Sequence, residues 1–518
     1  MALGYQRALH TRPQQQGLRT SGSAVQAAPL QPRAAPRGAV SRARPAAPCS
    51  GLRLRVVVAQ APPFIGGPTD TKPEDAAKHA AAKPHHNNHH NHNQHHQHQH
   101  TASPYGNAIL LQGFAWDSWK KGGGNWYGRV QAAIPALQAL HVSHVWLPPP
   151  SHSVSKEGYL PGQLYDLDSE YGNQAQLTEL CAALKAAGIS PMADIVINHR
   201  CADEQDPANG VYNNFLDEID HAGKAIDWGR WAITSNDPHF QGSGNPDTGD
   251  DFGAAPDLDH ANPELRAALV DWLNWLKTEV GFVGWRFDYV RGYAASFIAE
   301  YVDKTVGKDV LNVGEYWTEA QWQGEHLDFN QDGARQVLCN WLDKSHGRST
   351  AFDFPTKSLL QEACRHTQYN RLRDNQGKAP GLLGWWPSKA VTFIENHDTG
   401  STQQHWPFPN EYVGAGYAYL LTHPGIPSIF WDHVFEWGEP LRAEIAALTD
   451  LRRRAGLHSE SGLEVLAAEP DMYVARVGGR VTVKLGPRYD MGGLLPKEAE
   501  GWKFVSSGKD WAVWEKAG

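Results

Sequence analysis

Short apolar runs recur along the chain from residue 107 onward, and each run ends in polar or aromatic residues. Eight are present, beginning at positions 107, 141, 190, 284, 309, 349, 390 and 427. Near-continuous apolar strands that alternate with helical segments are typical of a parallel sheet buried on both faces. Eight such units predict an α/β fold, a closed (β/α)8 TIM barrel.

The helical spacing is clearest in the stretch "NPELRAALVDWLNWLKTEVG", residues 262–281. Its apolar side chains recur three or four residues apart: Leu265, Leu269, Trp272, Leu276 and Val280. Pro263 suits the first helical position because the backbone N–H that Pro lacks would have no acceptor within the helix there. Asn262, just before it, can cap the helix. The pattern therefore predicts a helix that starts at Pro263.

Two segments depart from the barrel pattern. Between His199 and Pro263 lie about sixty residues rich in Asp, Asn and Gly, and a loop of that length inside a compact domain is usually functional. Near the C-terminus apolar and polar residues alternate around the turn signal Gly478-Gly479, which predicts an antiparallel sheet. The predicted boundaries are a barrel over 105–198 and 261–456, a loop-rich domain B over 199–260 and a β-sheet domain over 457–518.

The first hundred residues have a different composition. Up to Pro68 there are nine Arg and no acidic residue, and the longest apolar run is the four-residue "VVVA". A secretory signal needs an apolar core of about 7 to 15 residues, so residues 1–60 are interpreted as an organelle transit peptide. Residues 61–104 contain a tract with nine His, 83–100, and are predicted to be a disordered linker because such a polar segment cannot bury a core.

Charge and cysteine content exclude several classes of protein. Without the nine leader Arg, 38 Lys and Arg stand against 56 Asp and Glu, a net charge near −18, which argues against a nucleic-acid partner. No stretch approaches 18 consecutive apolar residues, so no membrane span is predicted. The five Cys are odd in number and lack CxxC spacing, which argues against a zinc site or a disulfide framework and suits a reducing compartment.

Ionisable residues cluster where four of the predicted strands end. They are Asp194, Asn198 and His199, then Arg286 and Asp288, then Glu315, then Glu395, His397 and Asp398. Strand C-termini of a barrel gather at one mouth, so these side chains are expected to converge on one pocket. A single carboxylate at a strand end caps a helix or pairs with Arg as readily as it catalyses. Several negative charges in one pocket are costly, however, and their retention indicates a use.

Four of these segments carry a family resemblance. In order and spacing, "ADIVINHR", "GWRFDYVRGY", "VGEYWT" and "FIENHDTGSTQ" resemble the signature regions of the α-amylase family of glycoside hydrolases (family 13). The stretches "VWLPPPSHSVSKEGYLPGQLYDLD", "DTGDDFGAAPDLDH" and "VKLGPRYDMG" are similar to plant-type α-amylases, and the resemblance spans about residues 107–516. It implies the barrel, the domain B and the C-terminal sheet, and an enzyme that hydrolyses internal α-1,4-glucosidic bonds of starch.

Retaining cleavage of a glucosidic bond needs a carboxylate nucleophile and a carboxyl group that is first acid and then base. Asp288 is the predicted nucleophile, because Arg286 two residues earlier on the same strand face can keep it ionised. Glu315 is the predicted acid/base, with a pKa raised by the negative charges of Asp288 and Asp398. Asp398, by family correspondence, binds sugar hydroxyls and stabilises the oxocarbenium-like transition state.

The resemblance also implies a set of substrate-binding residues. Tyr159 corresponds to a stacking platform at the cleaved sugar, and His199 and His397 are expected to hydrogen-bond that sugar unit. Arg291 is an expected substrate-binding residue. Arg at this position makes different contacts from those of Lys, so the residue type at 291 is expected to affect which sugars the subsite prefers. Trp385 and Trp386 match a surface starch-binding pair, and Tyr489 matches a sugar-contacting Tyr of the C-terminal domain.

Calcium is the cofactor that the resemblance implies. A first site is implied at Asn198, Asp247, Asp257 and the carbonyl groups of Asp250 and Gly292. A second site, sharing Asp257, is implied at Asp237, Asp251, Phe252 and Ala255. Hard oxygen ligands on a flexible loop are what Ca²⁺ requires, and a solvated acidic loop is the alternative interpretation.

Two other functions remain open from the sequence. One is a related barrel enzyme, an oligoglucosidase or glucan transferase, and the other is a non-catalytic starch-binding regulator, which the presence of all three carboxylates disfavours. The expected partners are starch and malto-oligosaccharides, and a monomer is expected. The Ala- and Arg-rich leader resembles a green-algal plastid presequence, so the expected location is the chloroplast.

Overall fold

The computed structural model describes residues 103–215, 220, 222–223 and 227–517. The predicted transit peptide and nearly all of the predicted linker lie outside the described residues. Eight parallel strands close into a barrel in the order β1-β14-β13-β12-β9-β8-β5-β2. They are β1 (Leu110–Gln112), β2 (His144–Leu147), β5 (Ser190–Ile195), β8 (Gly284–Phe287), β9 (Val313–Gly314), β12 (Thr350–Phe352), β13 (Ala390–Thr392) and β14 (Ile426–Phe430). Seven lie within the apolar runs and β14 begins one residue before the eighth run, so the predicted barrel is confirmed.

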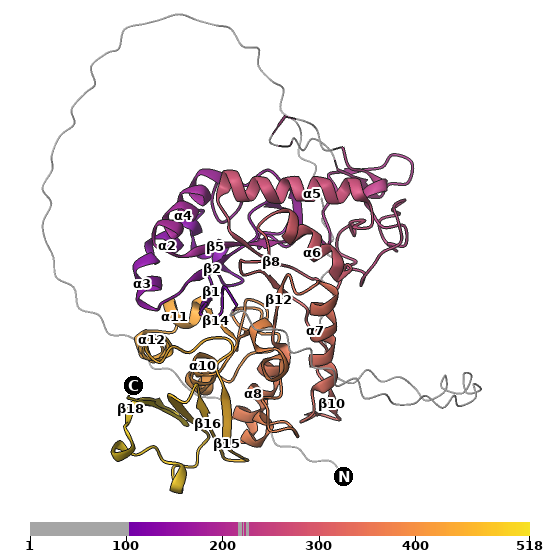
Figure 1. Ribbon diagram of the computed structural model, residues 1–518. Coiled ribbons are helices and arrows are strands. Elements are labelled where there is room, and N and C mark those ends of the chain that lie inside the picture. Colours follow the sequence, from indigo (N-terminus) through magenta and orange to yellow (C-terminus); the bar gives the residue numbers. More distant parts are fainter. Residues whose placement is uncertain (1–102, 216–219, 221, 224–226, 518) are drawn as a thin grey trace, which may run out of the picture. The chain divides into compact units, whose positions relative to one another are not determined.

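Helices stand around the barrel strands (Figure 1). They are α1 (Ser118–Lys121), α2 (Trp126–Ala132), α3 (Ile134–Ala139), α4 (Gln174–Ala186), α5 (Pro263–Trp275), α6 (Ala295–Lys304), α7 (Asp332–Lys344), α8 (Phe354–His366), α9 (Leu382–Trp385), α10 (Val413–Thr422), α11 (Trp431–Phe435) and α12 (Glu439–Arg454). Short 3-10 turns are η1 (Arg230–Ala232), η3 (Tyr369–Leu372), η4 (Pro387–Lys389), η5 (Asn410–Tyr412), η6 (Gly492–Leu494) and η7 (Glu498–Glu500). No helix of the described part is long and apolar enough to cross a membrane.

Helix α5 forms as its sequence predicts. The Asn262 side chain accepts the Glu264 N–H at 2.9 Å and so caps the N-terminus, where Pro263 is the first residue. A π-helical turn, η2 (Leu276–Val280), continues it to Gly281, which ends it with φ at 100°. The five apolar side chains singled out from the spacing are all buried. The apolar face of α5 therefore packs into the core, and the opposite, polar face of the helix lies in solvent.

The long connection between β5 and α5 holds little regular structure in its described part. It contains β6 (Glu204–Gln205), β7 (Tyr212–Asn214) and η1. Its end returns to its beginning, because His199 bridges Asp257 and Ile233 bridges Leu258. This closure brings residues near 257 beside the C-terminal end of β5, where the candidate site begins. The other barrel connections add two small hairpins, β3 (His152–Ser153) with β4 (Pro161–Gln163) and β10 (Trp322–Gln323) with β11 (His326–Leu327).

The C-terminal segment forms the expected antiparallel sheet, in the order β15-β16-β17-β19-β18. Its strands are β15 (Leu463–Glu469), β16 (Met472–Val477), β17 (Val481–Leu485), β18 (Trp502–Gly508) and β19 (Trp511–Lys516). Gly478 and Gly479, with φ at 58° and 68°, make the tight turn between β16 and β17. A buried hydrogen bond of 2.9 Å between His423 Nε2 and the Tyr473 hydroxyl joins this sheet to the barrel.

Candidate active site

Arg286 is the centre of a group of carboxylates at the C-terminal ends of β5, β8 and β9. Its fully buried Nη1 lies 2.7 Å from Asp194 Oδ1 and 2.7 Å from Asp288 Oδ1. Its Nη2 lies 2.8 Å from Glu315 Oε2. The structure therefore brings together the predicted nucleophile, the predicted acid/base and the Arg that was expected to keep Asp288 ionised.

Asp194 makes more contacts in this group than the sequence predicts. Its Oδ2 accepts hydrogen bonds from the Tyr159 hydroxyl at 2.8 Å and from Trp146 Nε1 at 3.0 Å. Asp194 and Arg286 are direct partners in the register of β5 and β8, which places the two side chains beside each other. Asp194 had been noted only as one of several strand-end charges. The strand pairing that a barrel imposes was the signal that could have assigned it to Arg286.

Burial controls the protonation of these carboxyl groups. The pKa of Glu315 is raised well above its ordinary value, first by burial and then by the charges of Asp288 and Asp398, while Arg286 opposes the shift. Burial likewise raises the pKa of Asp398 to about 7 and that of Asp194 to about 6, again against Arg286. The expected direction for Glu315 holds, but burial and not the neighbouring charges is the larger cause.

Aromatic rings line one side of this group. Tyr159, Trp116 and His397 form a group of three near-parallel rings: the Tyr159 ring plane is within 3° of Trp116 and 4° of His397, with centroids 5.9 and 5.1 Å away, and the Trp116 and His397 centroids are 6.1 Å apart. The ring of His397 is buried, which lowers its pKa well below the ordinary value and keeps the imidazole neutral. Its Nδ1 faces Gln112 Nε2 at 2.9 Å, and its Nε2 lies 3.3 Å from Asp398 Oδ2. With Gln112 donating to Nδ1, the imidazole proton sits on Nε2, toward Asp398.

His199 is held by protein partners. Its Nε2 is 2.9 Å from the Tyr159 carbonyl oxygen, its Nδ1 is 3.4 Å from Asn198 Nδ2, and its ring stacks on Phe252 at 3.7 Å. These contacts connect the Tyr159 platform to domain B. Sugar binding by His199 stays a prediction. The hydrogen bond to the Tyr159 carbonyl shows that His199 helps to hold Tyr159 in place.

Arg291 also has protein partners. Its Nε and Nη2 both lie 2.8 Å from Asp250 Oδ2, and its Nη1 donates to the Trp317 carbonyl at 3.1 Å. Arg291 therefore joins the long connection after β5 to the loop that carries Glu315. Its role as a substrate-binding cation stays a prediction.

Glu395 does not join the cleft carboxylates, although it had been grouped with the strand-end charges. Its Oε2 lies 2.9 Å from His433 Nε2, and its Oε1 accepts the Phe408 N–H at 2.7 Å. The carboxylate is buried, and its hydrogen-bond partners are His433 and Phe408 and not Arg286. The expectation that every charge in this cluster converges on one pocket was wrong for Glu395.

The three predicted surface aromatics differ in exposure. Trp385 and Trp386 are half-buried, and Trp385 is the last residue of α9. The Arg335 guanidinium lies over the Trp385 ring, 3.7 Å from its centroid. Tyr489 is 97% exposed and so is free of any core role.

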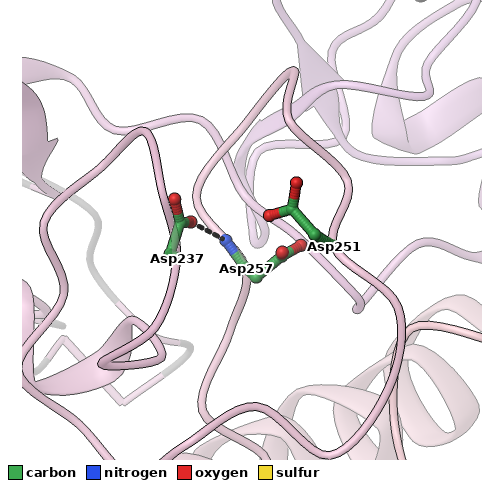
Figure 2. Close-up of side chains that lie close together, drawn as sticks. All are labelled: Asp237, Asp251 and Asp257. Atoms are coloured by element: carbon green, nitrogen blue, oxygen red, sulfur yellow. Dashed lines mark hydrogen bonds between the residues drawn. The ribbon is translucent and has the colours of Figure 1, made fainter. Parts of the chain in front are cut away.

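A cluster of acidic side chains lies in the long connection after β5. Carboxylate oxygens of Asp237, Asp251 and Asp257 lie within 4.8 Å of one another (Figure 2). Asp237 and Asp257 are buried and Asp251 is exposed, so the cluster opens to solvent on one side. Burial, the largest cause, and the adjacent Asp251 and Asp237 raise the pKa of Asp257 to about 8. A cation among these oxygens would remove the mutual repulsion.

The residues of the first implied calcium site also meet. Asn198 Nδ2 donates to Asp257 Oδ1 at 3.0 Å, and Asn198 Oδ1 is buried without a hydrogen-bond partner. A Cβ added to Gly292 would overlap Asn198 Oδ1, so glycine leaves room for the Asn198 amide against the backbone at position 292. The Asp250 N–H donates to the Arg291 carbonyl at 3.0 Å, which places Asp250 beside Gly292. An unpartnered buried amide oxygen next to carboxylates is the donor set of a hard cation, and these residues fit one.

Comparison with known proteins gives two family matches. A family model described as the alpha amylase catalytic domain matches residues 108–402, and one described as the alpha-amylase C-terminal beta-sheet domain matches residues 454–515. "Probable alpha-amylase 2" of Arabidopsis thaliana is 43% identical over 411 residues, 79% of this chain and 94% of that protein. "Alpha-amylase 3, chloroplastic" of the same plant is also 43% identical over 411 residues, which are 44% of that longer protein.

A solved structure gives a similar picture of the fold. The crystal structure of an Anoxybacillus alpha-amylase superposes with a TM-score of 0.57, covering 80% of this chain and 98% of that one. Its sequence identity is 16%, so the likeness is one of fold.

Proposed function

The chain belongs to the α-amylase family, and on that premise we propose that it hydrolyses internal α-1,4-glucosidic bonds of starch and malto-oligosaccharides with retention of configuration. The observation that carries the proposal is the contact of Asp288 and Glu315 with two nitrogens of one buried guanidinium, that of Arg286. A retaining enzyme needs two nearby carboxyl groups of unequal basicity. Here Asp288 forms an ion pair with Arg286, while burial favours the neutral form of Glu315.

In the first step Glu315 donates its proton to the glucosidic oxygen while Asp288 attacks the anomeric carbon. The bond from that carbon to the leaving oxygen breaks, and an ester to Asp288 forms. In the second step the Glu315 carboxylate takes a proton from water, the water oxygen attacks the anomeric carbon, and Asp288 leaves. Two inversions give net retention, and Glu315 is protonated again at the end.

Tyr159, His397 and Asp398 hold the sugar in this proposal. The Tyr159 ring, which lies near-parallel to those of Trp116 and His397, supplies a flat apolar face. The neutral His397 can donate from Nε2 to a hydroxyl group, and Asp398 beside it can accept from one. Charge on Asp398 also stabilises the positive charge that develops on the sugar in the transition state.

We propose Ca²⁺ as the resident cation of the acidic cluster. Asp237, Asp251 and Asp257 would hold one ion, with the Phe252 and Ala255 carbonyls, and Asn198, Asp247 and the Asp250 and Gly292 carbonyls would complete a neighbouring site. When bound, Ca²⁺ supplies no chemistry to the glucosidic bond but joins the connection after β5 to the barrel. Asn198 lies three residues beyond β5, so the ion would fix the segment that carries His199.

Following starch cleavage by iodine colour and by reducing ends together tests the proposed function. Internal cleavage shortens chains quickly, so the colour should disappear while only a small fraction of bonds has been cut. Persistent colour with steady release of small sugars would indicate an oligoglucosidase, and colour loss without matching reducing ends would indicate a transferase. No change in either signal would indicate a non-catalytic binding protein.

We further propose that the protein acts in the chloroplast. Support comes from the Arg-rich, acid-free leader and from the similarity to a relative named chloroplastic. Fusing residues 1–100 to a fluorescent reporter in an algal cell tests this. Plastid fluorescence is expected, and fluorescence in the cytosol, the mitochondria or the medium would refute the location without touching the catalytic proposal.

A further inference from the structure

The segment that carries His397 and Asp398 closes on a buried carboxylate that the proposed chemistry does not use. This segment, residues 395–408, is called the Asp398 loop. Glu395 at its start is 4% exposed, and its Oε1 accepts the N–H of Phe408 at its end, at 2.7 Å. One side chain thus joins the two ends of the loop.

The turn that presents Asp398 rests on the same carboxylate. A Cβ added to Gly400 would overlap the Glu395 carboxylate, so the backbone at Gly400 lies directly against it. Asn396 Oδ1 accepts the N–H groups of Asp398 at 3.1 Å and Thr399 at 2.9 Å. The orientation of Asp398 therefore depends on a tight turn that has no room to move toward Glu395.

Glu395 is itself fixed from the next two elements of the barrel. His433 of α11 lies 2.9 Å from Glu395 Oε2 through Nε2, and its Nδ1 lies 2.7 Å from the Tyr417 hydroxyl of α10. The Tyr417 oxygen accepts the Phe430 N–H at 3.1 Å, so its own hydrogen is available for His433 Nδ1. In this arrangement His433 donates from Nε2 to Glu395, and both carboxylate oxygens face donors.

A buried lysine holds the far side of the loop. Lys357 of α8 is fully buried, and its Nζ donates to the Trp406 carbonyl at 2.8 Å. Trp406 in turn donates its N–H to the Thr399 carbonyl at 3.1 Å. The turn with Asp398 is therefore held from Glu395 on one side and, through Trp406, from Lys357 on the other.

We propose that Glu395 is a positioning residue for the reaction: with His433 it fixes the Asp398 loop so that Asp398 meets the sugar beside His397. The inference rests on the proposed function, because it matters only if Asp398 acts on the transition state. A misplacement of about 1 Å at such a group costs on the order of a hundredfold in rate.

Glu395→Gln is the sharpest test because it keeps size and shape. A Gln amide must turn its NH2 group toward one of two donors. Toward the Phe408 N–H it opposes a hydrogen-bond donor, and toward His433 it forces the imidazole proton onto Nδ1, which leaves the Tyr417 hydroxyl hydrogen without its acceptor. The first arrangement breaks the contact that joins the two ends of the loop, and the second disturbs the support that residue 395 receives from His433.

Asp353→Asn is the matched control. Asp353 is a fully buried carboxylate that accepts the backbone N–H groups of Leu382 and Leu383, with Gly381 packed against it. It joins the end of β12 to the start of α9 and not to the Asp398 loop. Both variants are expected to lower the melting temperature, but only Glu395→Gln should lower kcat.

Steady-state kinetics on maltoheptaose, well below both melting temperatures, gives the decisive comparison. For Glu395→Gln we expect kcat to fall roughly ten- to a hundredfold with KM changed less than about threefold. Gly400→Ala, which presses on the same carboxylate from the loop, should give the same split and serves if Glu395→Gln does not fold. Unchanged kcat in either of these two variants, measured on folded protein, would overturn the inference.

Asp398→Asn separates this inference from the proposed function. Loss of activity in Asp398→Asn together with a normal Glu395→Gln would overturn the positioning role alone. Full activity in Asp398→Asn would overturn the proposed role of Asp398 and this inference with it.

Discussion

Arg286 Nη2 lies 2.8 Å from Glu315 Oε2, yet the pKa of Glu315 is raised well above its ordinary value. A cation at that distance would by itself lower the pKa of a carboxyl group. Burial outweighs it, because Arg286 is shared with Asp194 and Asp288, whose charges it also balances. A carboxyl group that keeps its proton beside a cation is the acid that a retaining glycosidase needs.

Glu315→Gln should therefore abolish hydrolysis while leaving binding intact. The amide keeps the shape of the side chain but has no proton to donate, so kcat should fall by roughly 10² to 10⁴. Reducing-end release measures the rate, and calorimetric titration with maltoheptaose measures the affinity. Glu319→Gln is the control, because its side chain is 89% exposed on the same loop. Near-full activity of Glu315→Gln would remove Glu315 from the mechanism.

Chelation should lower the melting temperature. An ion bound only by the folded state stabilises it by mass action, by about 2.7 kcal/mol when its concentration is a hundred times its Kd. Asp257→Asn, which removes a buried oxygen shared by both implied sites, should melt lower and respond less to chelator. Asp271→Asn, on the exposed face of α5, should behave as the wild type. An unchanged thermal transition in excess chelator would count against calcium.

The buried His423 should make the fold sensitive to acid. The pKa of His423 is lowered to about 3, mainly by burial, whereas it is about 6.5 in an unfolded chain. A depressed histidine pKa means that the unfolded state binds the proton first. Stability from this group is then complete above about pH 6.5 and declines as pH falls toward 3, by about 2 kcal/mol at pH 5.

Urea unfolding at about pH 7.5 and about pH 5 measures this difference. His423→Gln loses the titrating group, so its free energy of unfolding should fall about 2 kcal/mol less between the two conditions than that of the wild type. Equal losses in the two proteins would show that His423 does not titrate on unfolding.

Trp385→Ala should weaken binding to starch granules without changing kcat on maltoheptaose. Trp385 lies outside the carboxylate group, and stacking of one sugar on an indole contributes about 1 kcal/mol, a few-fold in affinity. Trp322→Ala is the control, because Trp322 is 43% exposed but belongs to no predicted site. Equal granule binding by wild type and Trp385→Ala would exclude Trp385 from the starch surface.

The barrel could be predicted from sequence because its strands are buried on both faces. A near-continuous apolar run such as that around β14 has few other stable arrangements, and the charges that follow such runs gather at one mouth. Asp288 and Glu315 each follow their strand directly, so their meeting at Arg286 followed from topology alone.

The positions of other residues depended on contacts that spacing does not carry. Glu395 and Asp398 are three residues apart, but a turn capped by Asn396 sends one beneath the loop and the other into the cleft. The size of the pKa increase that burial causes at Glu315 likewise depends on all the neighbouring residues that exclude water from it. Short-range patterns identify such residues as charged but not which way they face.

Trapping the glycosyl-enzyme is the most direct measurement of the central claim, that Asp288 is the nucleophile and Glu315 the acid/base. With α-maltosyl fluoride the leaving group needs no proton, so Asp288 of Glu315→Gln should still attack and release fluoride, and the ester should persist because no base activates water. Mass spectrometry of the digested protein should find one maltosyl unit on the peptide that contains Asp288, and none when Asp288→Ala is added. A maltosyl unit on Asp194 or Asp398 instead, or labelling that survives Asp288→Ala, would contradict the claim.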